Sequence, residues 1–384
     1  MMRRLAACAL CALLLPYGFD SLAMTAARLP SSTGAGQRAP ARGVQPAPDV
    51  TLSADTRQKL MASLNRAAEY LRQQQKADGT WENHPGVTAM AATALLRQPG
   101  VARGQQLQAV GKTLDYLRGL AKPDGGIYIK DIPHYITAVS VMTFVTAGQP
   151  QDKPLIDRGR QYLASHLIDE GEGVDPKDKF YGGLGWGGLS DGGKADIISM
   201  EYGLRAMKEA GLAANSDAWE KAIKFLQRTQ NIGELNDQGW ATNDGGFVYY
   251  PGFSTAGGTQ SYGSATYAGI MSYAWANLRK DDRRVQGVLK WVRDNYTVDE
   301  NPGLGQKTVY YYYMVFAKAL EAMGDAIIVD ARGQRHNWRE DLGRKLLALQ
   351  HPEGYWVNPV PDEMQDNKVL VTAFTMEALE AVLK

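Results

Sequence analysis

The sequence predicts an all-α fold, a six-hairpin α/α toroid built from two concentric rings of helices. From about residue 53 one unit recurs six times: a helix ending near a Tyr-Leu or Phe-Leu pair, a loop rich in Asp, Gly and aromatic residues, and a second helix of small and apolar residues. Within the helices, apolar residues are spaced by three and four positions. No segment alternates polar and apolar residues over a length that would predict a sheet.

The residues before the repeats predict export. Residues 1–23 are typical of a secretory signal peptide, because Arg3 and Arg4 precede an apolar run over residues 5–15 that is too short to span a bilayer. Cleavage is expected after Ala23. Residues 24–52, rich in Ala, Pro, Gly, Ser and Arg without apolar periodicity, predict a flexible linker. We therefore expect a periplasmic or extracellular protein with no transmembrane segment in its mature chain and a toroid over residues 53–384.

Composition argues against several classes of function. A net charge of +1, without a stripe of Lys and Arg or a recognisable motif, argues against nucleic acid as a partner. The chain has two cysteines, Cys8 and Cys11, and both lie in the predicted signal peptide. The mature chain would then have no disulfide, no cysteine nucleophile and no thiolate metal ligand. We expect neither a metal nor another cofactor.

The repeated units can be followed in order along the chain. Their loops centre on residues 78–81, 124–128, 181–188, 244–251, 299–305 and 353–356. Their second helices are expected over residues 87–96, 135–145, 196–207, 262–278, 310–323 and 369–383. These second helices are richer in small residues, which allow close approach, so we assign them to the inner ring.

Two of the loops carry a longer motif. It reads Gln75-x-x-Asp78-Gly79-x-Trp81 in the first unit and Gln350-x-x-Glu353-Gly354-x-Trp356 in the last. This pattern resembles the QW motif of squalene and oxidosqualene cyclases, and the repeat is also similar to that of the protein prenyltransferase β subunits. The likeness covers nearly all of residues 53–384 and implies the same toroid. We expect Gly to supply a turn, the acidic residue to accept N–H groups at a helix end, and Trp to cover the junction between hairpins.

The resemblance does not extend to the known chemistries of this fold. Triterpene cyclases protonate an alkene with an acid held in an Asp-x-Asp-Asp motif, which is absent here. The corresponding positions are Tyr262, Gly263, Ser264 and Ala265. Protein prenyltransferases bind zinc through Asp, Cys and His, and the mature chain has no Cys. The Cys-Gly-Glu-Gln thioester of complement-like toroids is also absent.

Four residues are candidates for acid or base catalysis. Asp196 opens the third inner helix with Ser199 one turn on, although a residue in that place also caps a helix. Asp131 and His134 precede the second inner helix and could act as an acid and base pair or form a surface pair. Asp244 opens the loop of the fourth unit, which is the fullest copy of the repeat.

A concentration of aromatic residues around the third to fifth units predicts a binding surface. Aromatic π faces suit an isoprenoid chain, a carbocation or a sugar ring, while packing in the core is the competing explanation for most of these residues. The candidates for ligand binding are Trp186, Trp240, Tyr249, Tyr250, Tyr262, Ser264, Tyr267 and Tyr310.

Three functions follow from these patterns. The first is a squalene-cyclase-like repeat protein whose central cavity binds an isoprenoid or another apolar ligand, with catalysis left open. The second is a secreted glycan-active hydrolase or lyase, which would need two carboxylates, or a Tyr or His with an Arg, on one cleft. The third is a non-catalytic scaffold that binds another protein, which would have a filled centre and an exposed apolar patch.

Overall fold

The computed structural model describes residues 51–187, 193–360 and 363–384. The predicted signal peptide, and the predicted linker up to residue 50, lie outside these residues. Ser53 caps the first helix by accepting the N–H of Thr56 at 3.2 Å. Leu52, just before it, is already buried in the core. Among the described residues, no helix is both long and apolar enough to cross a membrane.

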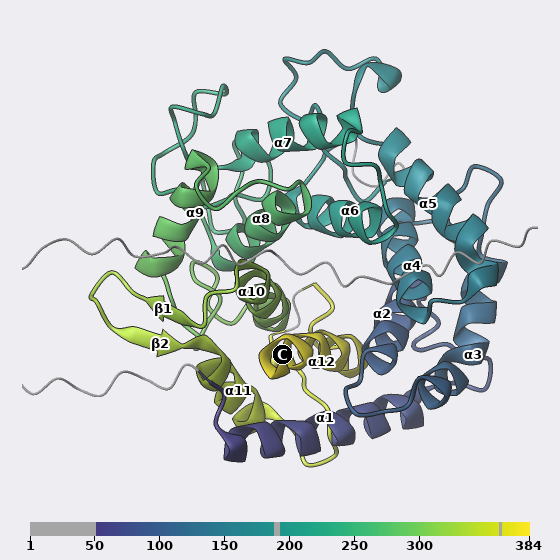
Figure 1. The fold of residues 1–384 in the computed structure, drawn as a ribbon. Helices are drawn as coiled ribbons and strands as arrows, with labels where there is room; N and C mark the ends of the chain where they lie inside the picture. Colours follow the sequence, from purple (N-terminus) through teal and green to yellow (C-terminus); the bar gives the residue numbers. More distant parts are fainter. Residues whose placement is uncertain (1–50, 188–192, 361–362) are drawn as a thin grey trace, which may run out of the picture. The chain divides into compact units, whose positions relative to one another are not determined.

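Two rings of helices alternate along the described chain (Figure 1). The outer ring consists of α1 (Ala54–Gln74), α3 (Arg103–Gly119), α5 (Lys153–Ser165), α7 (Asp217–Thr229), α9 (Arg283–Asp294) and α11 (Trp338–Leu349). The inner ring consists of α2 (Pro85–Leu96), α4 (Pro133–Ala147), α6 (Ile197–Glu209), α8 (Gly263–Trp275), α10 (Val309–Met323) and α12 (Lys368–Leu383). The predicted all-α, six-hairpin toroid is confirmed.

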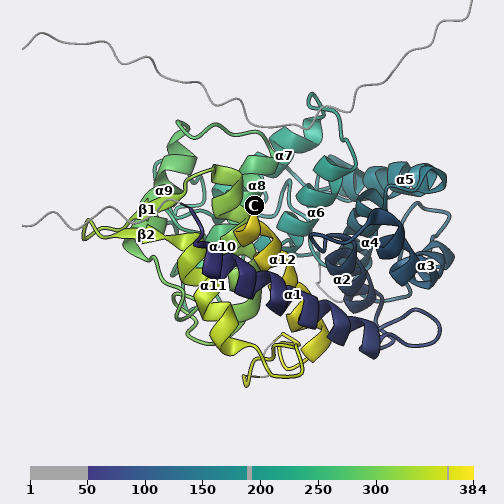
Figure 2. The same cartoon turned by 60° about the horizontal axis from the view of Figure 1, so that its bottom comes forward.

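The inner ring is closed. Each inner helix contacts the next one along the chain, and α12 contacts α2. Figure 2 shows α1 beside α11 and α12, where the last hairpin meets the first. A ring of this kind has no open end at which an apolar helix face would remain exposed.

Inner helices are buried on every side, whereas outer helices bury one face. All residues of α2 are buried, and so are the four successive tyrosines at 310–313 in α10, because an inner helix is covered on every side. The outer helix α7 instead buries one face, which includes Trp219, Phe225 and Leu226. The alternation of fully apolar and amphipathic helices in the sequence therefore matches the two rings.

The loop glycines lie directly against the next outer helix. Gly79 has φ +86°, and a Cβ there would lie 2.7 Å from the backbone of Lys112 in α3. Gly354, with φ +98°, would meet the carbonyl oxygen of Arg66 in α1 at 2.5 Å. A Cβ at Gly125 would likewise lie 3.0 Å from the carbonyl oxygen of Arg158 in α5. Only glycine combines this backbone conformation with such close approach, so these loops hold neighbouring hairpins together.

Glutamine side chains join the same neighbours by hydrogen bonds. Gln75 Nε2 donates to Thr113 Oγ1 of α3 at 3.0 Å. Gln350 Nε2 donates to the carbonyl of Ser63 in α1 and to that of Gly354, both at 2.9 Å. The hydrogen bond from Gln350 to Ser63 links the last unit to the first and closes the ring.

The two tryptophans act within their own hairpins. Trp81 is fully buried, its Nε1 donates to the carbonyl of Leu71 in α1 at 2.7 Å, and its backbone N–H donates to Thr88 Oγ1 in α2 at 3.0 Å. Trp356 repeats both contacts with the corresponding residues of α11 and α12. Trp therefore joins the outer helix of its hairpin to the inner one, and its predicted cover of the junction between adjacent hairpins stays a prediction.

The acidic residues of the loops also differ from expectation. Asp78, Asp124 and Asp244 accept the backbone N–H two residues later, at 3.0, 2.8 and 2.9 Å. These bonds stabilise a turn inside the loop and do not reach the N–H groups of a helix end. Asp side chains are well suited to this geometry because they are short.

A small sheet interrupts the helical pattern between α10 and α11. Strand β1 (Ile327–Val329) pairs antiparallel with β2 (Arg335–Asn337). The sequence does not predict these strands, because three residues are too few to show an alternating pattern. Two short 3-10 helices, η1 (Pro150–Asp152) and η2 (Glu170–Glu172), complete the elements of the described chain.

Replacing the loop glycine that closes the ring tests its role. We expect Gly354→Ala to destabilise the fold by about 3 kcal/mol or more, since both backbone strain and a clash with Arg66 are introduced. The control is Gly257→Ala, which has the same φ of +98° but open space around the added Cβ, and should cost only about 1–2 kcal/mol. Urea unfolding measures both, and equal losses would contradict the proposed role of the contact.

Candidate functional site

A cavity of about 670 Å³ lies at the N-terminal ends of the inner helices. All six inner helices, or the residues just before them, contribute to its wall. Five of the helices do so with residues three or four positions apart, which lie on one helix face. These pairs are His84 and Val87, Ile132 and Tyr135, Ile198 and Tyr202, Thr308 and Tyr311, and Leu370 and Phe374. The wall is therefore mainly aromatic and aliphatic.

Four of the residues predicted to bind a ligand line this cavity: Trp186, Tyr249, Tyr262 and Ser264. Trp186 Nε1 donates to Tyr249 Oη at 3.2 Å, which fixes both rings. Burial, with a contribution from the Asp196 carboxylate, raises the pKa of Tyr249 and of Tyr262, so both hydroxyls remain protonated at neutral pH. Tyr262 and Ser264 are two of the positions where the resemblance would place a catalytic acid.

The other four predicted ligand-binding residues do not line the cavity. Tyr267 is buried between α8 and α10, with its ring 5.6 Å from that of Tyr312. Tyr310 is buried beside Tyr313. Tyr250 stacks on Phe253 with ring centroids 4.7 Å apart. Trp240 is half-buried in the loop before α8. These residues pack within the ring or its loops. Packing in the core was the competing explanation for most of the aromatic candidates.

The predicted catalytic residue Asp196 is the N-cap of α6. Its Oδ1 accepts the N–H groups of Ile198 and Ser199, both at 2.9 Å, and its Oδ2 accepts the Ser199 hydroxyl at 2.7 Å. The carboxylate is 3% exposed and influences the pKa of Tyr249 and Tyr262, so it lies behind the cavity wall. These are the contacts of a residue that caps a helix, which was the alternative to catalysis for Asp196.

The other three predicted catalytic residues have separate surroundings. Asp131 is exposed. His134 Nδ1 lies 3.0 Å from the carbonyl oxygen of Gly185, and its ring packs against that of His166 at 5.1 Å. Asp244 Oδ1 accepts the Ser261 hydroxyl at 2.8 Å in addition to its turn bond. None of these three residues, nor Asp196, lines the cavity.

A layer of aromatic side chains forms the floor of the cavity, and sequence reasoning missed it. The rings of Tyr135 and Tyr202 are 5.0 Å apart, those of Tyr202 and Tyr311 are 6.2 Å apart, and those of Tyr311 and Phe374 are 5.9 Å apart. Each belongs to a different inner helix. Tyr311 is one of four successive tyrosines, and Tyr135, Tyr202 and Phe374 lie in helices of mainly small and apolar residues, so no local signal separates any of them from ordinary core residues.

Buried charges lie beyond this floor, toward the C-terminal ends of the same helices. Arg205 of α6 is 1% exposed and donates to Glu209 at 3.0 Å and to Glu377 of α12 at 3.1 Å. Lys318 of α10 lies 2.7 Å from the same Glu377 carboxylate. Glu209 also pairs with Arg97, at the end of α2, at 3.3 Å. Charged residues inside otherwise apolar helices were the sequence signal for this cluster.

Glu201 also lies in this buried cluster, but burial raises the pKa of its carboxyl group. It is 1% exposed, and its Oε2 has no hydrogen-bond partner among the described residues. Burial raises the pKa of Glu201 from 4.5 to about 7, against the opposing influence of Arg205 and Lys318. The side chain is therefore an uncharged acid below neutral pH.

Charged groups are few on the cavity wall. Among the described lining residues, Glu363 carries the one carboxylate and Lys307 the one ammonium group. Burial lowers the pKa of His84, the N-cap of α2, so its imidazole is neutral at pH 7. Among the described residues, no group of three His, Cys, Asp or Glu side chains could hold a metal ion.

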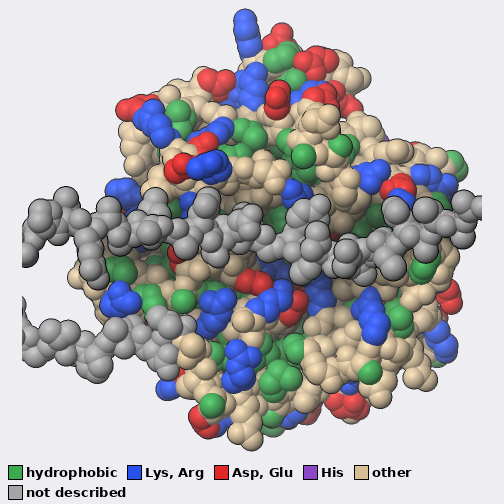
Figure 3. All heavy atoms as spheres, in the orientation of Figure 1, with side chains coloured by type: hydrophobic (Ala, Val, Ile, Leu, Met, Phe, Trp, Pro, Cys, Tyr) green, Lys and Arg blue, Asp and Glu red, His purple; other side chains and the backbone are tan. Residues whose placement is uncertain are grey.

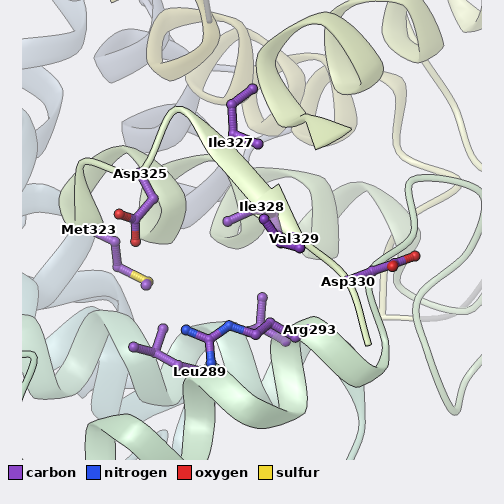
Figure 4. A pocket seen from close by; sticks show the side chains of 9 residues that line it. Leu289, Arg293, Met323, Asp325, Ile327, Ile328, Val329 and Asp330 are labelled. Carbon is purple, nitrogen blue, oxygen red and sulfur yellow. The ribbon is translucent and has the colours of Figure 1, made fainter. Parts of the chain in front are cut away.

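A second pocket, of about 430 Å³, lies on the outer side of the ring between α9 and β1 (Figure 4). Its wall combines aliphatic groups with Arg293 and two aspartates. Asp325 pairs with Lys280 at 3.2 Å, and Asp330 accepts N–H groups of its own turn. Acidic and basic side chains are interspersed over the molecular face in Figure 3. Neither the second pocket nor this face brings reactive side chains together.

Comparison with solved structures supports the fold. The type II terpene cyclase MstE from Scytonema, as a variant bound to its product merosterolic acid A, aligns with a TM-score of 0.53 and 15% identity, covering 86% of this chain and 99% of that chain. A glycosidase variant aligns with a TM-score of 0.52 and 13% identity, covering 86% and 99%. A polysaccharide lyase aligns with a TM-score of 0.52 and 13% identity, covering 85% and 97%.

Sequence comparisons add no family. No model of a known protein family matches the sequence, and no curated protein matches it. At 15% identity or less, the three structures share with this chain the α/α toroid fold.

The buried acid Glu201 predicts a dependence of stability on pH. Between pH 4.5 and about 7 the folded protein keeps a proton that the unfolded chain releases, so stability falls as pH rises through this window. Glu201→Gln should remove this loss. From pH 5 to pH 8 its advantage over wild type in urea unfolding should grow by about 1–3 kcal/mol.

The control for this experiment is Glu220→Gln on the exposed face of α7. It should leave the pH dependence of wild type unchanged. An advantage of Glu201→Gln that stays constant with pH would show that Glu201 is ionised in the folded protein.

Proposed function

We propose that the central cavity binds an isoprenoid or another apolar small molecule. The observation that carries this proposal is the cavity itself: about 670 Å³ at the N-terminal ends of the six inner helices, lined by these helices and the loops before them, with a mainly aromatic and aliphatic wall. That volume is in the range of sites for small organic ligands. Its tyrosine and tryptophan faces suit unsaturated hydrocarbon chains.

The terpene cyclase neighbour supports the ligand class. A variant of MstE has been solved with the substrate geranylgeranyl dihydroxybenzoate, which contains an isoprenoid chain, at a TM-score of 0.53 to this chain and 14% identity. We confine the proposal to binding. The positions of the cyclase acid hold Tyr262 and Ser264, and a hydroxyl is too weak an acid to protonate an alkene.

We also propose that the protein works outside the cytoplasm. The support is the pattern of residues 1–23, in which two arginines precede a short apolar run. An apolar ligand in a periplasmic or extracellular protein would be sheltered from water in the cavity. The same export prediction is shared by the glycan hypothesis, so it does not separate the two.

The glycan-active alternative has less support from the site. A glycosidase needs two carboxylates facing one cleft, and Glu363 is the one carboxylate among the described lining residues. A lyase that eliminates with Tyr or His and Arg would find tyrosines and His84 but no arginine on the described wall. The glycosidase and lyase neighbours share the fold with this chain, which does not carry over their chemistry.

The scaffold alternative requires a filled centre, and the cavity argues against it. Large hydrophobic residues that are exposed among the described residues are few: Ile129, Phe253, Val329, Leu349 and Met364. Phe253 and Met364 line the cavity, so they are more consistent with an entrance for an apolar ligand than with a protein-binding patch elsewhere.

A filled cavity should prevent ligand binding. We expect organic extracts of the purified protein to contain an isoprenoid or other apolar lipid by mass spectrometry, and Ile198→Trp to reduce its amount by roughly tenfold because the indole occupies the cavity. Ile129→Trp, at a side chain 53% exposed outside the cavity, is the control and should retain the lipid. The proposal fails if wild type carries no lipid and does not bind added farnesol.

A further inference from the structure

His84 carries a hydrogen-bond donor that the described protein does not use. Its imidazole lines the cavity and is half-buried. Nδ1 accepts the N–H of Val87 at 3.3 Å, which caps α2. Nε2 has no hydrogen-bond partner among the described residues and, unlike the hydroxyl oxygens of Tyr202 and Tyr311, it is not fully closed off inside the protein. This nitrogen can therefore pair with a group from outside the chain.

The helix cap determines which nitrogen carries the proton. A neutral imidazole has one nitrogen that donates and one that accepts. Burial lowers the pKa of His84, so the ring is neutral at pH 7, and the nitrogen that accepts the Val87 N–H has no proton. Nε2 then carries the proton and is a donor. A ligand group that pairs with Nε2 must supply an acceptor, such as an oxygen.

The imidazole lies close to the aromatic floor of the cavity. A Cβ at Gly86 would lie 3.1 Å from Cε1 of His84 and 2.7 Å from Cε1 of Tyr135, so the two rings approach each other over a residue without a side chain. Tyr135 and Val87 also line the cavity. A ligand whose oxygen pairs with His84 would thus have apolar and aromatic surface next to that oxygen.

Other polar groups of the wall are less suited to select a ligand. Asn301 Nδ2 already donates to the hydroxyls of Ser264 and Thr308, both at 3.0 Å. Lys307 supplies a second donor, but its side chain is exposed, so water can pair with its ammonium group whether or not a ligand is bound. A half-buried donor that loses its water to a ligand needs a replacement acceptor, because an unpaired donor is unfavourable.

The backbone around the cavity is strained, and two of the strained residues directly precede His84. Of the seven non-glycine residues with positive φ in the described chain, Glu82 and Asn83 lead into His84. Four others line the cavity: Ile132, Thr308, Glu363 and Met364. Left-handed backbone is unfavourable for such residues, above all for the β-branched ones, and strain of this kind gathers at ligand sites. The position of His84 is therefore held at a cost in stability, as expected for a binding residue.

We propose that Nε2 of His84 donates a hydrogen bond to an oxygen of the ligand, and that the cavity therefore takes an apolar molecule with a hydroxyl, ether or carbonyl oxygen. The inference rests on the proposed ligand-binding function and specifies the ligand class and the residue that selects it. A hydrocarbon that displaces water from Nε2 leaves the donor unpaired, whereas a ligand oxygen replaces the water.

Three ligands with one farnesyl skeleton test the proposal. They are farnesol, its methyl ether, whose oxygen only accepts, and the hydrocarbon with hydrogen in place of the hydroxyl. Each is titrated into the full protein while tryptophan fluorescence is followed, with Trp186 in the cavity wall as a reporter. The ratio of the Kd of the hydrocarbon to that of each oxygenated ligand is compared between variant and wild type, because the hydration of the free ligands then cancels.

Two substitutions of His84 remove the donor in different ways. His84→Ser keeps a side-chain oxygen that can accept the Val87 N–H but has no Nε2. His84→Phe keeps an aromatic ring but has neither nitrogen. In both variants the ratio should fall roughly tenfold for farnesol and for the methyl ether, the effect of about one net hydrogen bond. If one variant fails to fold, the other carries the comparison, since the two differ in the cap.

His351→Ser is the matched control. His351 Nδ1 also accepts a backbone N–H, that of Glu353 at 3.3 Å, but it lies exposed in a loop outside the cavity. This variant should keep the wild-type ratio for both oxygenated ligands.

The outcomes separate this inference from the proposed function. Unchanged ratios in the His84 variants would overturn the inference and leave apolar binding standing. A ratio that falls for farnesol but not for the methyl ether would show that the ligand oxygen donates, and would overturn Nε2 as the donor. A fall in Lys307→Met without one in the His84 variants would assign the oxygen to Lys307 and overturn the role of His84. No binding of any of the three ligands would overturn both proposals.

Discussion

The contact between a loop glycine and the backbone of the next outer helix is the constraint on which the ring depends. Gly79, Gly125 and Gly354 each lie so close to a neighbouring helix that no other residue fits without displacement. The Gln side chains of the first and last loops add hydrogen bonds across the same junctions. Since the last junction reaches α1, a short motif used repeatedly brings together residues almost 300 positions apart.

This closure produces a centre whose character changes along the axis. The N-terminal ends of the inner helices surround the cavity, aromatic rings form its floor, and paired charges follow toward the C-terminal ends. Three of the inner helices, α6, α10 and α12, contribute to all three layers with residues one or two turns apart, as Ile198, Tyr202 and Arg205 do in α6. The floor separates an apolar chamber from buried ions, and its tyrosines can meet both environments because each ring is apolar and carries one polar group.

The candidate site was predictable in part. Local sequence pointed to the start of the fourth inner helix, and Tyr262 and Ser264 do line the cavity. The carboxylates chosen from the sequence have local roles there: Asp196 caps a helix and Asp244 closes a turn. A short acidic side chain before a helix or after a loop has the same sequence signature whether it stabilises a turn or faces a ligand.

The sequence by itself determined the repeat, the number of hairpins and the ring to which each helix belongs, because these follow from periodicity and from short motifs such as Gln75 to Trp81. The tertiary structure decided which residues face the centre. Tyr202 and Tyr267 are both tyrosines in apolar helices, yet one lines the cavity and the other packs between helices. That difference depends on how each helix is rotated about its axis, which an inner helix apolar on every side does not encode locally.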